Sequence, residues 1–143
     1  MSYVDSEDSI KRFVQNNADI HISLLMLEEG TISDINIRDS SYNDRTALMY
    51  QARYGTVESM ESLLAYKPPA LPNLQDRGGW MALHLAVSLG DNPAKVRLLL
   101  DYGADKTIVV RNRLGETALD WARRYNRTEC IKVLESYTPK LRG

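Results

Sequence analysis

Three stretches of this chain repeat one another at a nearly constant interval. They read TALMYQARYG at 46–55, MALHLAVSLG at 81–90 and TALDWARRYN at 117–126. Their shared leucine recurs after 35 and then 36 residues, at Leu48, Leu83 and Leu119. An interval of this size indicates stacked copies of one small unit, because each copy needs a neighbour to bury its apolar side. Any fold assigned to the chain has to accommodate this repetition.

Each copy is predicted to contain two short helices. In the first copy Leu48 and Ala52 are four residues apart, which places them on one helical face, and Met60, Leu63 and Leu64 form a second apolar stripe. Helices of two or three turns are marginally stable alone, because nucleation costs more than so few hydrogen bonds return. The helices are therefore expected to stack on their neighbours in an all-α solenoid.

Turn-forming residues separate the predicted helices. The segments NLQDRGGW at 73–80 and VRNRLGE at 110–116 each carry Asp or Asn three residues before a Gly. Gly55, Gly90 and Asn126 follow the three first helices, and we expect them to end these helices in a left-handed backbone conformation. Pro93, behind Asp91 and Asn92, suits a first helical position.

These features together resemble the ankyrin repeat, whose pattern is a hairpin loop, a helix of the TPLHxA type, a Gly, a Leu-rich helix and a GAD-like ending. The best match is MALHLAVSLG followed by VRLLLDYGAD at 96–105, and the resemblance covers about residues 34–137. It implies a solenoid of about four helix-turn-helix repeats joined by hairpin-like loops. Ala47, Ala82 and Ala118 replace the family's Pro, and Lys-Pro-Pro at 67–69 replaces Gly-Ala-Asp, so that loop is expected to run differently.

The whole chain, 1–143, is expected to form one domain. A divergent N-terminal repeat is assigned to about 8–38, followed by repeats at about 39–73, 74–109 and 110–138 and a short tail at 139–143. The N-terminal repeat is predicted from two apolar stripes, Ile10 with Phe13 and Val14, then Ile22 with Leu25 and Met26, joined by a turn at 16–19.

Composition and charge exclude several classes of function. The formal net charge is -1, which argues against sequence-independent binding to nucleic acid or to anionic lipid. No apolar run approaches the roughly 18 residues of a membrane span, and the acidic start lacks the pattern of a secretory signal. Cys130 is the only cysteine, so an intracellular, reducing compartment is expected, either cytoplasm or nucleus.

No catalytic or metal-binding constellation is visible in the sequence. Cys130 lies on an apolar helical stripe and is expected to be buried and inert. His84 occupies the position of a structural His in the repeat, and His21 stands alone. One Cys and two distant His provide no metal-ligand spacing, and the Gly-Gly of DRGGW lacks the pattern of a phosphate-binding loop. We expect no enzymatic activity, no cofactor and no metal.

The resemblance also suggests where a partner would bind. In the family, the hairpin tips and the exposed side of the first helices contact partner proteins. Asn43, Ser88 and Glu116 occupy such positions, and the partner-binding candidates carried over to this chain are Tyr42, Arg45, Arg53, Tyr54, Arg77, Trp80, Leu89, Arg113, Leu114, Arg124 and Tyr125.

The candidate positions are rich in Arg, Tyr and Trp, the side chains enriched at interaction hot spots. Our hypothesis is a monomeric adaptor, scaffold or inhibitor whose basic, aromatic groove binds an acidic partner segment with one or two apolar anchors. Two alternatives remain open. The same side chains could simply cover the surface, or they could bind nucleic acid by charge and stacking, against which the net charge argues.

Overall fold

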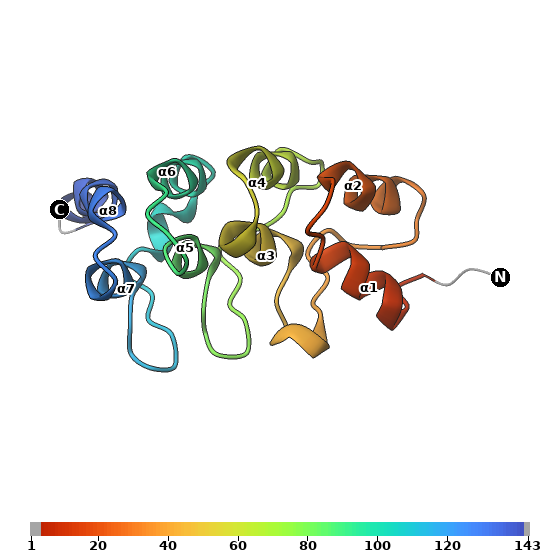
Figure 1. Ribbon diagram of the computed structural model, residues 1–143, viewed down its shortest axis with the longest axis horizontal. Helices are drawn as coiled ribbons and strands as arrows, with labels where there is room; N and C mark the ends of the chain where they lie inside the picture. The colour runs from red at the N-terminus through yellow and green to blue at the C-terminus, as the bar shows by residue number, and fades with distance from the viewer. Residues whose placement is uncertain (1–3, 142–143) are drawn as a thin grey trace.

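The structure is a computed structural model that describes residues 4–141, with side chains described up to residue 137. It consists of helix pairs stacked side by side in two layers (Figure 1). The first helices of the pairs form one layer and the second helices form the other, while hairpin loops project from the layer of first helices. The bounds of the pairs are α1 Glu7–Val14 with α2 Ile20–Glu28, α3 Ala47–Tyr54 with α4 Val57–Leu64, α5 Ala82–Ala86 with α6 Pro93–Asp101, and α7 Ala118–Arg124 with α8 Thr128–Leu141.

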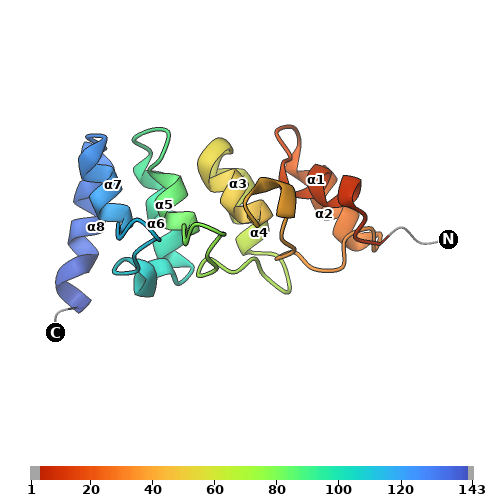
Figure 2. The ribbon, with the colours of Figure 1, turned by 90° about the horizontal axis from the view of Figure 1, so that it is seen from below.

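The expected all-α solenoid is confirmed. Neighbouring first helices pack on one another along the stack, as do neighbouring second helices (Figure 2). Two short 3₁₀ helices, η1 at Ser40–Tyr42 and η2 at Ala104–Thr107, lie in the connections, and residues 4–141 contain no β-strand. No helix among these residues has both the length and the apolar composition needed to cross a bilayer.

Capping side chains fix where the helices begin. Thr46, Thr56 and Thr117 each accept a hydrogen bond from a backbone N–H in the first turn of the helix that follows. Asn92 caps α6 in the same way, and Pro93 occupies the first position of that helix as predicted.

The periodic leucines line the shared interior, with a difference at the C-terminal end. Leu48 and Leu83 are fully buried, whereas Leu119 is only half-buried because no further repeat follows α7 in the described chain. Much of the rest of the core comes from the second helices and the first repeat, including Phe13, Met60, Leu63, Leu99 and Leu134.

The expectation for the residues that end the first helices holds only at Asn126. Asn126 has a φ of 55°, but Gly55 has a φ of -95° and Gly90 does not adopt a positive φ. Gly55 is needed for a different reason, because a Cβ there would overlap the Gln51 side chain. Close packing, and not a left-handed backbone, explains the glycine at position 55.

The N-terminal repeat contains the predicted pair of helices, but one of its stripes needs correction. Phe13, Val14 and Met26 are buried, whereas Ile22 and Leu25 are each 51% exposed. The reason is that no repeat of the described chain packs against that side of α2. At the other end of the chain α8 continues to Leu141, so residues 139–141 of the expected tail are helical, and residues 142–143 lie outside the described part.

Candidate protein-binding face built from hairpins and first helices

Two of the hairpins share one turn geometry. In the hairpin at 76–80 the Asp76 carboxylate accepts hydrogen bonds from the N–H groups of Gly78 and Trp80, at 2.9 and 2.8 Å. In the hairpin at 112–116 the Asn112 carbonyl oxygen accepts from Leu114 and Glu116 at 2.9 and 3.0 Å. The Gly predicted three residues after each of them adopts a positive φ, 80° at Gly79 and 79° at Gly115. The sequence therefore identified both turns.

The hairpins are joined to each other in a row. The N–H of Arg77 donates to the carbonyl of Asn43 at 2.9 Å, and the N–H of Arg113 donates to the carbonyl of Gly78 at 2.9 Å. The first hairpin, 39–45, is longer and contains η1. Each hairpin tip is therefore held at a fixed distance from the next one, and the row of tips lies along one side of the surface that contains the candidate residues.

Arg45 does not belong to the exposed face. It is only 7% exposed, and its Nε lies 2.9 Å from a carboxylate oxygen of Asp76, which is equally buried. The Arg45 guanidinium therefore forms an ion pair between consecutive repeats, and we remove Arg45 from the partner-binding candidates. Glu116 and Ser88 are buried as well.

An N-terminal aromatic cluster lies beside the first hairpin. Tyr42 packs edge-on against Tyr50 with ring centroids 5.8 Å apart, and Tyr50 lies 5.0 Å from Tyr54. Arg53 lies over the Tyr54 ring at 5.4 Å. Burial raises the pKa of both Tyr42 and Tyr50 above the ordinary value, so these phenols stay neutral.

A C-terminal aromatic cluster lies between the last two repeats. Trp80 packs edge-on against Trp121 with centroids 4.3 Å apart, and Trp121 lies 5.0 Å from Tyr125. The indole N–H of Trp121 donates to a carboxylate oxygen of Glu116 at 2.9 Å, and Glu116 also pairs with Arg124, which lies over the Trp121 ring. Trp80 is half-buried as a result.

Sequence reasoning missed Tyr50 and Trp121. The signal was present, because each lies four residues before a candidate, Tyr54 or Tyr125, and residues four apart share a helical face. Both belong to the same face as the predicted residues, and both connect them into clusters.

One row of side chains on this face is well exposed. Tyr54, Leu89 and Tyr125 occupy equivalent positions at or just beyond the C-terminal ends of α3, α5 and α7, and they are 52%, 54% and 43% exposed. Leu114, at the tip of the last hairpin, is 71% exposed. These exposed apolar side chains recur at one position of three successive repeats, a regularity that singly scattered surface residues do not have.

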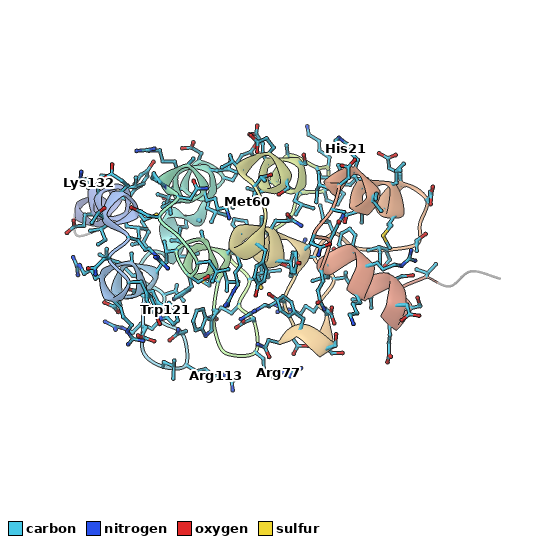
Figure 3. The ribbon with its side chains drawn as sticks, viewed as in Figure 1. His21, Met60, Arg77, Arg113, Trp121 and Lys132 are labelled. Atoms are coloured by element: carbon cyan, nitrogen blue, oxygen red, sulfur yellow. The ribbon has the colours of Figure 1, made fainter. Side chains whose placement is uncertain are left out.

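The positive charge of the face is smaller than the sequence suggested. Arg77 pairs with Asp44 at 3.3 Å, Arg124 pairs with Glu116, and Arg45 is buried with Asp76. Among the described residues, no carboxylate lies within ion-pair distance of Arg53 or Arg113. Figure 3 labels Arg77 and Arg113 at the hairpin end of the molecule. The guanidinium of Arg77 is directed toward the hairpin at 39–45, where it donates to the carbonyl of Ser40 at 3.2 Å.

We call the groove face the surface made by these exposed and half-buried residues: Tyr42, Arg53, Tyr54, Arg77, Trp80, Leu89, Arg113, Leu114, Trp121, Arg124 and Tyr125.

The nucleophilic and titratable groups have structural explanations. Burial, with the nearby Asp91 carboxylate, raises the pKa of the Cys130 thiol to about 12, so a thiolate nucleophile is strongly disfavoured. His84 is fully buried; its Nδ1 accepts from the N–H of Met81 and its Nε2 lies 3.0 Å from the carbonyl of Glu116. The described residues contain no group of three or more His, Cys, Asp or Glu that could hold a metal ion.

Comparison with known proteins identifies the repeat. The family described as ankyrin repeats (3 copies) matches residues 5–109 and 68–141. The 26S proteasome non-ATPase regulatory subunit 10 of Dictyostelium discoideum is 32% identical over 99 residues, which cover 69% of this chain but only 40% of that protein. With a family match over most of its length and the helix pairs and hairpins described above, this chain belongs to the ankyrin-repeat family.

Proposed function

We propose that the protein is an intracellular interaction module that binds a partner protein through the groove face, as an adaptor, scaffold or inhibitor. The observation that carries the proposal is the exposed row of Tyr54, Leu89 and Tyr125 at equivalent positions of three repeats. Large apolar and aromatic side chains that share a face with Arg are the usual anchors of protein interfaces. The similarity to a proteasome regulatory subunit supports a role in binding proteins and an intracellular location.

The partner segment is proposed to be acidic, with one or two apolar anchors. The apolar anchors would contact the row around Leu89. Arg53 and Arg113 would then supply the positive charges, because the carboxylates of Asp44 and Glu116 already partner Arg77 and Arg124. This is a more specific requirement than general attraction to acidic proteins, since only two cations of the face are without a carboxylate in the described chain.

Binding to nucleic acid is the weaker alternative. Stacking requires open aromatic faces, but Arg53 lies over Tyr54, Arg124 over Trp121 and Arg127 over Tyr125. Three arginines of the predicted basic set are also neutralised by carboxylates. These arrangements favour a protein partner over a phosphate backbone.

A display library of random 12-residue peptides tests the proposal directly. Selection on the wild-type protein is expected to enrich acidic peptides with large apolar residues, and Leu89→Asp is expected to abolish their binding. Leu25→Asp is the matched control, because Leu25 is equally exposed but lies on α2, away from the groove face. Enrichment of basic peptides, or equal binding to both variants, would contradict the proposal.

A salt titration separates the alternative. Binding of a single-stranded oligonucleotide through several phosphates should weaken steeply and linearly on a log–log plot of affinity against salt. We expect no such binding at physiological salt. Tight, steeply salt-dependent binding that Arg113→Glu removes would support the nucleic-acid function instead.

A further inference from the structure

The helix pairs of the stack meet at junctions that are not built alike. We call the contact between α1/α2 and α3/α4 the first junction, the contact between α3/α4 and α5/α6 the second, and the contact between α5/α6 and α7/α8 the third. At the first junction α1 packs on α3, and α2 on α4, less extensively than α3 packs on α5 or α6 on α8. Burial of apolar surface between neighbours is what couples one repeat to the next, so the first junction is expected to couple its repeats weakly.

Three cavities lie along the first junction. One of about 340 Å³ is lined by Lys11 of α1 and by Ser41 of the hairpin at 39–45. A second, of about 140 Å³, lies between the connection from α1 to α2 and Tyr54 of α3. The largest, about 600 Å³, is lined by Leu27 of α2 and by Tyr66, which follows α4. Atoms that face a cavity lack packing partners on that side, so each cavity weakens the attraction between the two helix pairs.

The bonds across the junctions differ as well. Backbone hydrogen bonds of Arg77 and Arg113 join the hairpins across the second and third junctions, and Arg45 with Asp76 adds a buried ion pair at the second. In the part of the chain that the structure describes, neither a backbone hydrogen bond nor an ion pair joins residues 7–28 to residues 39–141. The first junction therefore lacks the two kinds of bond that strengthen the second.

Two glutamine side chains make the hydrogen bonds that do cross the first junction. Gln51 donates to the carbonyl of Asn16 at 2.7 Å and accepts from the hydroxyl of Ser59 at 2.8 Å, and Gln15 donates to the Asp39 carboxylate at 2.8 Å. Water replaces hydrogen bonds of this kind when two surfaces separate, so their net contribution to coupling is small.

We propose that the helix pair α1/α2 separates from α3/α4 as a unit while the rest of the stack stays folded. The stability of a repeat protein is approximately the sum of the stabilities of its repeats and of the contacts between neighbours. Partial opening therefore takes place at the junction with the weakest coupling. The cavities, the limited helix packing and the small set of bonds identify that junction as the first one.

Opening at the first junction also changes the N-terminal aromatic cluster. Tyr50 and Tyr54 line the 140 Å³ cavity, and Tyr42 packs against Tyr50. Separation of α1/α2 removes one wall of that cavity, so the surroundings of Tyr54 on the groove face differ between the closed and the open form. The opening itself is measured without a partner, so this proposal does not depend on the function proposed for the groove face.

Hydrogen–deuterium exchange of the full chain, followed by mass spectrometry at low urea concentrations, tests the opening. Amides within α1 and α2 are expected to exchange at least about tenfold faster than amides within α4 and α6. They are also expected to exchange faster than amides within α7, at the opposite end of the described stack. Protection of α1 and α2 equal to that of α4 overturns the proposal, and so does equally fast exchange in α7, because it would show fraying at both ends.

Gln51→Ala tests whether the first junction controls the opening. Alanine occupies the equivalent positions 86 and 122 and is buried there, so α3 is expected to accept it. Loss of the hydrogen bonds of Gln51 is expected to speed exchange within α1 and α2 by about tenfold and to leave exchange within α6 unchanged. Circular dichroism checks that the variant is folded.

Ser88→Ala is the matched control for Gln51→Ala. It removes a buried hydroxyl whose hydrogen bond, to the carbonyl of Leu85 at 2.7 Å, stays within its own repeat. Exchange within α1 and α2 is expected to be the same as in the wild type. A folded Gln51→Ala variant in which α1 and α2 exchange no faster than in Ser88→Ala overturns the assignment of the opening to the first junction.

Discussion

The hairpins at 76–80 and 112–116 have the same backbone hydrogen bonds but are anchored by different chemistry. The first is held by an ion pair, because Arg45 of the preceding repeat reaches Asp76. The second is held by a neutral side chain, because the Nε2 of His84 lies 3.0 Å from the carbonyl of Glu116. The hairpin at 76–80 also has a neighbouring hairpin on each side, whereas residues 4–141 contain no hairpin beyond the one at 112–116.

This comparison explains why an acid stands at position 76. The second carboxylate oxygen of Asp76 is needed for Arg45, while the corresponding amide nitrogen of Asn112 is buried without a hydrogen-bond partner. The turn itself requires only one acceptor oxygen, which both residues supply. Identical local geometry is thus compatible with different contacts between repeats, and each hairpin depends on its own anchor.

Asp76→Asn should have the largest effect on stability. It keeps the oxygen that accepts from the turn but leaves the buried Arg45 without its counter-charge, and breaking a buried ion pair costs about 3–5 kcal/mol. Urea denaturation followed by circular dichroism measures the loss. Arg77→Ala, which breaks the exposed pair with Asp44, is the control and should cost less than about 1 kcal/mol. Equal losses would show that the buried pair is not the anchor.

Gly79→Ala and Gly115→Ala compare the two hairpin turns directly and should have the next largest effect on stability. Both glycines have a φ near 80°, so an alanine at either position must adopt a left-handed backbone, which lowers the free energy of unfolding by about 1–2 kcal/mol. A Cβ at Gly79 would also lie 3.1 Å from the backbone nitrogen of Arg113, while a Cβ at Gly115 would meet nothing within 4 Å. Gly79→Ala should therefore be the more destabilising by about 1–3 kcal/mol in the same denaturation assay.

The pH dependence of the free energy of unfolding should report on His84, the neutral side chain that anchors the hairpin at 112–116. Burial lowers the pKa of His84 below its ordinary value, so the unfolded chain binds a proton at a higher pH than the native one does. Stability is fully present above about pH 6.5 and should fall by up to about 1.4 kcal/mol per pH unit from there down to the lowered pKa. Urea midpoints between pH 7.5 and 5 measure it. The slope should vanish in His84→Gln and persist in His21→Gln, and a slope kept in His84→Gln would refute this assignment.

The sequence predicted the repeated framework well because that framework follows from periodic residues. The spacing of Leu48 and its equivalents, the Asp-to-Gly spacing of the turns and the position of Pro93 each identified an element that the structure contains. Such features depend on neighbours within one repeat, so a single copy carries the information.

Contacts between repeats were beyond the reach of the pattern. Arg45 meets Asp76 from 31 positions away, and neither residue type at its position indicates burial. In the same way, periodicity placed Ile22 and Leu25 in a stripe but could not show that both side chains are exposed in the described structure. A period shows which residues are equivalent, whereas their environment depends on what each copy has for a neighbour.

The smallest expected effect compares the two hairpin tips as partner contacts. Arg77 is already engaged by Asp44, so replacing it by alanine removes a cation that is largely neutralised. Among the described residues Arg113 has no carboxylate within ion-pair distance, and it stands next to the exposed Leu114.

Isothermal titration with an acidic peptide from the selection should give about a tenfold loss of affinity for Arg113→Ala and about threefold or less for Arg77→Ala. Because both side chains are exposed, the urea midpoints of the two variants should stay close to that of the wild type. A larger loss for Arg77→Ala would mean that the partner displaces Asp44 from Arg77, and the assignment of the accessible charge to Arg113 would have to be reversed.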